Sequence, residues 1–522
     1  MVRNSWNVPH LSSLKTGASQ ATSAATSDSS ECGLWGSVRL TYTICAFLSN
    51  ILQMALRNML GLVILRMVKA RPEDALLYSP EYQFNNLTAM SNCGNEVFEP
   101  SARLDVAQQT GDLKWTRNQE LTFPGTFYYG YVIALPLAGH LADRFGGKLL
   151  FISSLALQAL AFLLLPFIAP FSYIAAVITL VLAGIFGGCG APPLYQLFVT
   201  WAHPTERTWM LSFAYSGMIV GSICIYPLAN YLSDFGWKVP FFVLGGITLL
   251  YGIICNWFIY NSLDDHPRVT EAERTYLQPT SCAQAPQHFS TPWRSLLTSA
   301  PVYAFVFTHV FHNYGFLLLS LNVPRFMSEA MQFNMKEIGF LASAPFLGSF
   351  FSKLLCVFSC SYFEGRFISQ LGFLRRLLYA TCCCATICLI AVIILASCKQ
   401  KTLVLLMYFL VGLTTDLAFS GGYWPTLLYF APSFAGLISG LANCMAHISG
   451  FATPHLVAAL VHSGMKSEWN WVLLTYIFFN ALAMIVFGLF SSSKLQEWDP
   501  RCQQDTKTSN ISNSNRKPSN TC

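Results

Sequence analysis

Residues 139–148 read Gly-His-Leu-Ala-Asp-Arg-Phe-Gly-Gly-Lys and join two long apolar runs. Three of these residues, Asp143, Arg144 and Lys148, carry charge, and the connection is too short to hold a domain. Short charged loops between apolar runs are typical of membrane proteins, in which basic loops set the orientation of the chain. The stretch therefore indicates an all-α polytopic membrane protein.

The composition of the whole chain supports that class. Of the 522 residues, 53% are hydrophobic and 11% are charged, and the mean hydropathy is +0.45. Soluble domains carry about 25% charged residues, so most of this chain must face lipid or packed apolar helix. The net charge of +6 is modest and does not indicate a nucleic-acid partner.

The sequence contains no pattern for covalent chemistry. No glycine-rich phosphate loop follows an expected strand, and no pair of C-x-x-C units has zinc spacing. Such motifs need fixed spacings, because they place backbone N–H groups or thiolates around one ligand. No nucleophile–base arrangement is visible either. We therefore expect no enzyme activity, no cofactor and no bound metal.

Twelve segments are long and apolar enough to cross a bilayer, which takes about 20 residues each. They lie near residues 39–66, 121–141, 149–169, 172–199, 209–233, 240–261, 299–321, 337–360, 374–398, 402–425, 434–462 and 470–491. The polar segment 262–298 divides them six and six. We predict an N-terminal half at 39–261 and a C-terminal half at 299–491, flanked by a disordered tail at 1–38 and a second tail at 492–522.

The distribution of basic residues predicts the orientation. Lys and Arg gather in the even-numbered loops, the central segment and the C-terminal tail, which places these parts and both tails in the cytoplasm. The long loop at 69–120 then lies on the other side. It contains Asn86-Leu87-Thr88, a glycosylation acceptor in the right compartment, so we expect a glycan on Asn86.

Several ordered motifs resemble one transporter family. Residues 139–148 fit the G-x-x-x-D-R-x-G-x-K loop between helices 2 and 3 of major facilitator transporters. GTFYYGY at 125–131, WAHPTER at 201–207, DHPR at 265–268 and QEW at 496–498 resemble solute carrier family 17. That group includes sialin, the vesicular glutamate transporters and the sodium–phosphate cotransporters. The resemblance implies the major facilitator fold of twelve membrane helices in two halves, and an anion as substrate.

The chain departs from this family at charged positions. Leu180 and Gly187 stand where many members carry an Arg and a Glu in helix 4. Pro124 replaces a His of the glutamate carriers, Tyr429 replaces a common acidic residue, and His312 stands where glutamate carriers have an Arg in helix 7. The mechanism of the glutamate carriers or of sialin is therefore not directly transferable.

Arg57 is the strongest candidate for an anion-binding residue. A charge in mid-membrane costs at least a few kcal/mol and usually marks a pathway or a paired structural site. The planar guanidinium fork matches a carboxylate or a phosphate. Alternatively, Arg57 pairs with an acid or with backbone carbonyls and never meets substrate. We favour anion binding, because no acid in the first six spans is an obvious partner.

Other polar side chains in the spans are secondary candidates. His309 and His312 lie one helical turn apart, and an unperturbed His titrates near neutral pH. We predict that His312 contacts substrate and that His309 takes part in ion coupling, although both could be packing residues. The hydroxyls of Tyr128 and Tyr195 are candidates for hydrogen bonds to an organic anion, or they satisfy one another in the bundle.

Two isolated charges occur in the second half of the chain. Asp416 lies deep in an expected span, and we predict that it couples transport to a proton or a sodium ion. Lys353 is seven residues from a loop, so we expect its side chain to reach toward the membrane surface. The alternative is that Lys353 and Asp416 form a buried coupling pair.

The charged loop itself predicts a conformational switch. Asp143 and Arg144 can pair with Glu206 and Arg207 of the next cytoplasmic loop and hold that side closed in one state. The same residues also serve as topology signals, and we expect both roles. The loop contributes nothing to the choice of substrate.

These observations predict a secondary active transporter of small organic or inorganic anions, which works by alternating access. A proton, a sodium ion or the membrane potential would drive it. One alternative is a sodium-dependent phosphate cotransporter. Another is a non-transporting receptor or sensor, because helix 4 lacks its charges. The expected partners are a small anion, a coupling ion (H⁺ or Na⁺) and the bilayer of the plasma membrane or of an endolysosomal or vesicular membrane.

Overall fold

The computed structural model describes residues 36–69, 111–282, 291–366 and 370–500. Every regular element within these ranges is a helix, and the β pairing found there is one isolated bridge between Val68 and Leu113. The expected all-α fold class is therefore confirmed. Asn86 lies outside the described residues, so its glycosylation stays a prediction.

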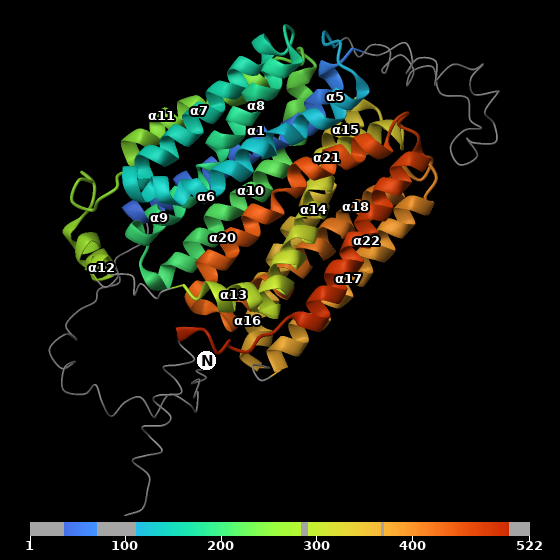
Figure 1. Ribbon diagram of the computed structural model, residues 1–522. Coiled ribbons are helices and arrows are strands. Elements are labelled where there is room, and N and C mark those ends of the chain that lie inside the picture. The colour runs from blue at the N-terminus through green and yellow to red at the C-terminus, as the bar shows by residue number, and fades with distance from the viewer. Residues whose placement is uncertain (1–35, 70–110, 283–290, 367–369, 501–522) are drawn as a thin grey trace, which may run out of the picture.

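The helices form two groups that lie side by side in Figure 1. The first half consists of α1 (Val38–Met67), α5 (Arg117–Thr122), η1 (Phe123–Thr126), α6 (Phe127–Phe145), α7 (Gly147–Ile168), α8 (Tyr173–Gly188), α9 (Ala191–Trp201), α10 (Pro204–Ser233) and α11 (Val239–Phe258). The connection contains α12 (Glu271–Cys282) and α13 (Trp293–Thr298).

The second half begins at α14 and ends at α22. Its elements are α14 (Ala300–Glu329), α15 (Met335–Leu341), α16 (Ala344–Arg366), α17 (Leu371–Leu395), α18 (Lys401–Leu417), η3 (Ala418–Tyr423), η4 (Trp424–Thr426), α19 (Leu427–Phe430), η5 (Pro432–Phe434), α20 (Ala435–Ala446), α21 (Ser449–Leu460) and α22 (Lys466–Phe490). Several membrane spans are thus built from two or more consecutive helices, such as α8 with α9 and α20 with α21.

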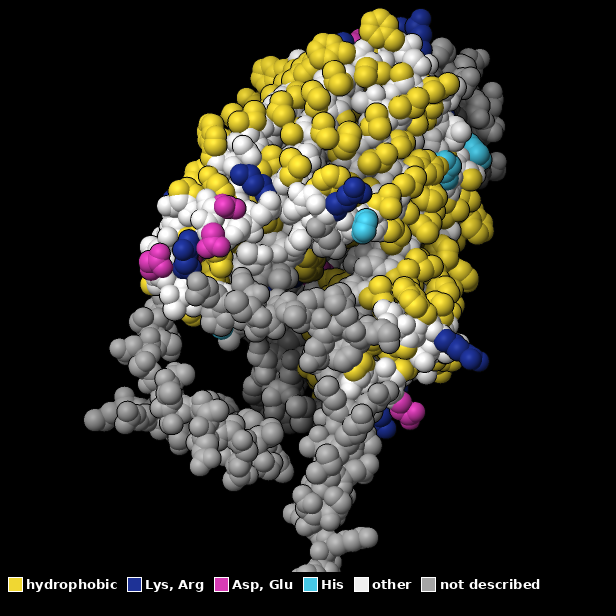
Figure 2. All heavy atoms as spheres, turned by 60° about the vertical axis from the view of Figure 1, so that its left-hand side comes forward, with side chains coloured by type: hydrophobic (Ala, Val, Ile, Leu, Met, Phe, Trp, Pro, Cys, Tyr) yellow, Lys and Arg dark blue, Asp and Glu magenta, His cyan; other side chains and the backbone are white. Residues whose placement is uncertain are grey.

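The expected spans agree with these helices. Within the described residues, 11 helical segments are long and apolar enough to cross a membrane. The remaining expected span, near 121–141, corresponds to α5, η1 and α6, which follow one another without a gap. Figure 2 shows hydrophobic side chains over much of the visible face, as a lipid-facing surface requires.

The largest difference from the expected boundaries lies at the end of the seventh span. The seventh span was expected to end near residue 321, and Pro324, Arg325 and Glu329 lie beyond that point. Instead α14 continues to Glu329. The charges do not end the helix because each is paired inside the protein, and membrane helices tolerate Pro where neighbouring groups satisfy the backbone.

Each half contains a pair of glycines at a close helix crossing. An ideal Cβ built on Gly130 or Gly184 would lie 2.0 or 1.9 Å from a carbonyl oxygen across the contact between α6 and α8. The corresponding distances for Gly348 and Gly412, at the contact between α16 and α18, are 2.0 and 1.8 Å. Small residues let membrane helices approach this closely. The second and fourth spans of each half therefore share one packing device.

Replacing Gly412 by Val is expected to prevent folding of the second half. The added side chain overlaps the backbone at Pro345, and overpacking costs about 1–3 kcal/mol even where neighbours can relax. Gly488 in α22 is the matched control, since nothing lies within 4 Å of its ideal Cβ. Size-exclusion profiles and thermal unfolding of detergent-solubilised protein should show loss of the G412V monomer peak only. Equal profiles for the two variants would contradict this packing.

The two halves meet mainly at one end. We call the end where α5 begins and α14 ends the upper end, and the end with α12 and α13 the lower end (Figure 1). Contacts between halves join α1 to α14, α10 to α15 and α16, and α5, η1 and α6 to α20 and α21. At the crossing of α1 with α14, an ideal Cβ on Gly61 would lie 2.8 Å from the carbonyl oxygen of Leu321.

Candidate functional site

Arg57 is buried in α1, and the described residues give its charge no acidic partner. The residue is 7% exposed, its Nη2 donates to Met54 Sδ over 2.8 Å, and its Nε is buried without any hydrogen bond. Among the described residues, no carboxylate forms an ion pair with it. A guanidinium in this position is therefore available to an anion.

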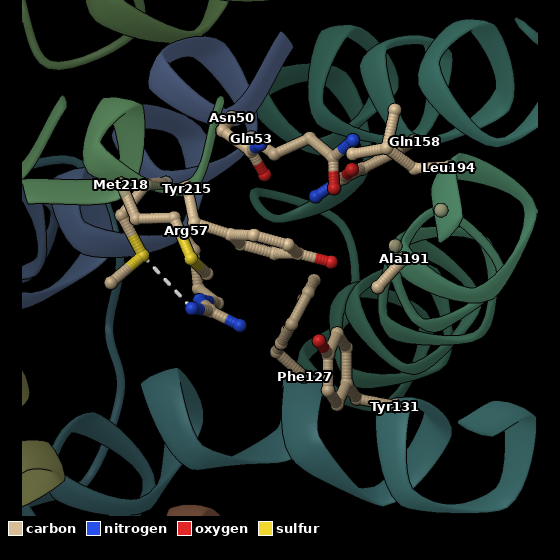
Figure 3. A pocket seen from close by; sticks show the side chains of 13 residues that line it. Asn50, Gln53, Arg57, Phe127, Tyr131, Gln158, Ala191, Leu194, Tyr215 and Met218 are labelled. Atoms are coloured by element: carbon tan, nitrogen blue, oxygen red, sulfur yellow. Dashed lines mark hydrogen bonds between the residues drawn. The ribbon is translucent and has the colours of Figure 1, made fainter. Parts of the chain in front are cut away.

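Polar side chains of the first half surround a small cavity beside Arg57 (Figure 3). The cavity is lined by Asn50, Gln53, Met54, Arg57, Phe127, Tyr131, Gln158, Gly187, Gly190, Ala191, Leu194, Tyr215 and Met218. Its volume is about 30 Å³, measured to the centres of water-sized spheres, and one water needs roughly 10–15 Å³ on that measure. The cavity fits water in this state, and a whole organic anion requires side chains or helices to move apart.

The structure brings Tyr128 to Arg57. The guanidinium carbon of Arg57 lies 5.7 Å from the ring centroid of Tyr128 and 5.5 Å from that of Tyr131. The Tyr128 hydroxyl is buried without a hydrogen-bond partner. Tyr195 does not line the cavity; it is 53% exposed and its ring centroid lies 5.6 Å from that of Tyr215, which does.

Gln158 lines the cavity but was not selected from the sequence. Its buried Oε1 has no hydrogen-bond partner, and an ideal Cβ on Gly187 would meet its Nε2 at 3.2 Å. Gly187, which stands where many family members were expected to carry a charged residue, has no side chain. The space beside it is occupied by Gln158 and Phe127. The signal available in the sequence was a single amide inside the apolar run 149–169.

The two histidines of α14 differ in their surroundings. His309 Nδ1 lies 2.8 Å from the Tyr423 hydroxyl and its Nε2 lies 3.1 Å from Asn443 Oδ1, so both ring nitrogens are occupied. The ring of His312 lies 5.2 Å from that of Phe419. His312 borders a second, smaller cavity of about 10 Å³ within the second half, apart from the cavity at Arg57.

Lys353 and Asp416 form an ion pair, as the second alternative above expected, and a coupling role for it stays a prediction. Lys353 Nζ lies 3.1 Å from Asp416 Oδ1. The Ser420 hydroxyl donates to Asp416 over 3.3 Å and accepts from Lys353 over 3.3 Å. The side chain of Lys353 stays 35% exposed, and its charge is paired with Asp416 of α18. Ser420 belongs to the π-helical turn η3, and such turns are frequent at functional sites.

Removing the charge of Asp416 is expected to change the ion dependence of uptake. The D416N variant also removes the carboxylate that pairs with Lys353 and should lower the yield of folded protein, because breaking a partly buried ion pair is costly. The double variant K353M/D416N removes both charges and should recover yield without recovering ion dependence. Uptake at varied sodium and pH measures this. Unchanged sodium and pH dependence in both variants would contradict a coupling role.

Four charges join the two halves at the upper end. Arg117 of α5 donates to both carboxylate oxygens of Glu329 of α14, over 2.5 and 2.6 Å. Arg325 of α14 donates to Glu120 of α5 over 2.6 Å and to Glu329 over 3.2 Å. Trp469 Nε1 also donates to Glu329, over 3.1 Å. We call Arg117, Glu120, Arg325 and Glu329 the upper-end cluster.

The predicted switch residues at the lower end have other partners in this state. Glu206 pairs with Arg39 of α1, whose Nε also donates to Glu273 over 3.3 Å. Arg207 Nη2 donates to the carbonyl oxygen of Ala202 over 3.2 Å. The guanidinium carbon of Arg144 lies 5.6 Å from the ring of Phe145.

The switch hypothesis therefore stays a prediction. The side chain of Asp143 lies outside the described part of the structure, so its pairing with the next loop is not seen. Glu206 is held by Arg39 instead of by Arg144. Glu273 of α12 also accepts from the first backbone N–H groups of α1, those of Val38 and Arg39, and thereby fixes the central connection to the first half.

The comparisons with known proteins agree with the architecture. The model of the Major Facilitator Superfamily matches residues 88–454. The D-xylose–proton symporter superposes with a TM-score of 0.62 at 12% identity, covering 87% of this chain and 98% of its own. A bacterial homologue of the human lysosomal transporter Spinster, in an inward-facing and occupied conformation, gives a TM-score of 0.58 at 13% identity, with 88% and 99% covered.

Sequence relatives place the chain more closely. Sialin of Ovis aries is 28% identical over 419 residues, which cover 79% of this chain and 84% of sialin. Sialin of Homo sapiens is 27% identical over 467 residues, with 88% and 91% covered. Vesicular glutamate transporter 2 of Homo sapiens is 25% identical over 413 residues, with 77% and 70% covered. The resemblance to the sialin and vesicular glutamate transporter group is thus confirmed, and the chain belongs to the Major Facilitator Superfamily of multi-pass membrane transporters.

Proposed function

We propose that this protein is a secondary active transporter that binds a small anion at Arg57. The supporting observation is a guanidinium that is buried, lacks a carboxylate partner among the described residues and borders a polar cavity. An uncompensated charge in mid-membrane is costly. A bound anion offsets that cost, and the guanidinium fork favours a carboxylate, because it can donate two parallel hydrogen bonds.

The position of the closed end supports alternating access. Arg57 lies ten residues before the upper end of α1 at Met67, about 15 Å along the helix, and the upper-end cluster lies beyond it. With both tails and the central connection in the cytoplasm, this state is closed on the non-cytoplasmic side. The substrate then exchanges with the cytoplasm until the halves rock apart at the upper end.

Uptake into proteoliposomes tests the transport function. Purified full-length protein would be tested with radiolabelled sialic acid, glutamate, urate, phosphate and a nucleotide, under an imposed proton, sodium or potential gradient. We expect at least one anion to accumulate above protein-free liposomes. A receptor on the same scaffold gives no accumulation of any anion under any gradient, and that result would overturn the proposal.

A further inference from the structure

His447, which was not selected from the sequence, lies at the boundary between the halves. It occupies the break between α20 and α21, where its carbonyl oxygen accepts from the backbone N–H of Gly450 over 2.9 Å. Its ring centroid lies 4.8 Å from that of Tyr131 and 6.2 Å from that of Tyr128, both on α6. A ring of the second half therefore packs against the first half in mid-membrane, and broken membrane helices commonly border transport sites.

Arg57 contacts the same two tyrosines from within the first half. Its guanidinium carbon lies 5.5 Å from the Tyr131 ring centroid and 5.7 Å from that of Tyr128. The charged or titratable groups that face His447 are Arg57 of α1, the two tyrosines of α6 and His309 of α14. Among these groups, Arg57 is the permanent cation.

The hydrogen bonds of His447 leave one ring nitrogen for a ligand. Its Nδ1 lies 2.7 Å from the backbone carbonyl oxygen of Asn443, and a carbonyl can only accept, so Nδ1 carries a proton. Nε2 has no hydrogen bond to the residues that the structure describes. In the neutral ring Nε2 is an acceptor, whereas in the imidazolium it donates. Only the protonated ring can therefore hold an anion at Nε2.

The two histidines of α14 do not fit this role. Both ring nitrogens of His309 are already hydrogen-bonded, to Tyr423 and Asn443. His312 borders the separate cavity within the second half and stacks on Phe419. His447 is left as the titratable ring that shares its neighbours with Arg57.

Resting on the transport function proposed above, we propose that His447 completes the anion site from the second half and binds the anion in its protonated form. In the empty site, a proton on His447 is repelled by the charge of Arg57. An anion held by both removes that repulsion, so the anion and the proton favour each other's binding, reciprocally. A monocarboxylate then crosses with one proton as a neutral pair, and its contact with both halves ties binding to their movement.

The test compares H447Q with H455Q in proteoliposomes of the full-length protein. His455 of α21 is a matched control: its Nδ1 lies 2.8 Å from the carbonyl oxygen of Phe451, the same local hydrogen bond, but it is exposed and its Nε2 lies near the Tyr129 hydroxyl. The probes are radiolabelled sialic acid and L-glutamate. Accumulation driven by a pH gradient is measured beside counterflow exchange at equal pH on both sides, at saturating probe.

We expect H447Q to lose pH-driven accumulation by about tenfold or more, within the usual range of coupling between two ligands. Its exchange should persist and become independent of pH, whereas exchange by wild type and H455Q should weaken as pH rises. A second variant, H447K, carries a fixed charge; it should exchange at all pH values and should not accumulate the probe in response to a pH gradient.

Three results would overturn the role of His447 while leaving transport intact. The first is pH-driven accumulation by H447Q at the wild-type level. The second is loss of exchange in H447Q and H447K while their unfolding temperatures are unchanged. The third is accumulation by the wild type that is driven by a sodium gradient but not by a pH gradient. Absence of uptake by the wild type itself, with every probe, would instead overturn the transport function.

Discussion

Replacing Arg57 by Ala is expected to abolish anion uptake while the protein still folds and reaches the membrane. The guanidinium has no ion-pair partner among the described residues that its loss would strand. Two charge-assisted hydrogen bonds to a carboxylate are worth about 1.5–3 kcal/mol each, so their loss lowers affinity by roughly 100-fold or more. The measurement is initial uptake against probe concentration, normalised to the amount of protein in the membrane.

Two further variants show whether the fork of Arg57 matters. R57K keeps the charge but loses the bidentate geometry, so it should retain partial uptake with a raised half-saturation concentration. Arg66 is the matched control in the same helix. It pairs with Asp234 over 2.9 Å at the upper end, where both side chains are partly exposed, and R66A should transport at close to the wild-type rate. Normal uptake by R57A would remove Arg57 from the site.

Replacing Glu329 by Gln is expected to open the upper end. Glu329 accepts from Arg117, Arg325 and Trp469. Its loss removes the carboxylate that Arg117 and Arg325 share. Removing one partner from a buried ion network costs about 3–5 kcal/mol. That energy is lost only by the state in which the halves meet at this end, so the equilibrium shifts toward the opposite state by two or more orders of magnitude.

Hydrogen–deuterium exchange of the purified protein measures this shift. Backbone amides of α5 and of the last turns of α14 should exchange faster in E329Q, and turnover should fall because the molecule returns to the closed state less often. Glu337 is the matched control at the same end. It pairs with Lys401 over 3.5 Å on the exposed surface, and E337Q should change neither quantity. Unchanged exchange in E329Q would show that the cluster does not hold this end closed.

The sequence predicted the parts of the structure that depend on runs of similar residues. Apolar segments gave all twelve spans, because lipid exposure acts on every side chain of a helix. The same reasoning placed Arg57 in the middle of a helix. It singled the residue out as a candidate because a charge in mid-membrane is energetically costly. It failed at the end of α14, since nothing local shows that Arg325 and Glu329 are paired with residues of α5.

Contacts between distant helices were beyond the sequence for the same reason. A helical pattern shows which face of a helix is buried, but it does not show which helix lies opposite. Lys353 was therefore assigned to the surface although Asp416 faces it, and His447 passed as one more polar residue in an apolar run. The candidate site depends on such contacts between helices. The sequence predicted Arg57 and Tyr128 as site residues, whereas Gln158 and His447 were recognised only from their neighbours in the folded protein.

The close backbone contact at Gly61 divides α1 into two parts of unequal length. Six residues separate Gly61 from the upper end of α1 at Met67, and 23 separate it from the start at Val38, which correspond to about 9 and 35 Å. If the two halves tilt about this contact, their displacements scale with these lengths. Moving the halves apart by about 2 Å at the upper end would bring them together by about 8 Å at the lower end. A small separation at the upper end, where the ion pairs of the upper-end cluster would break, would then produce a movement of several ångströms at the lower end.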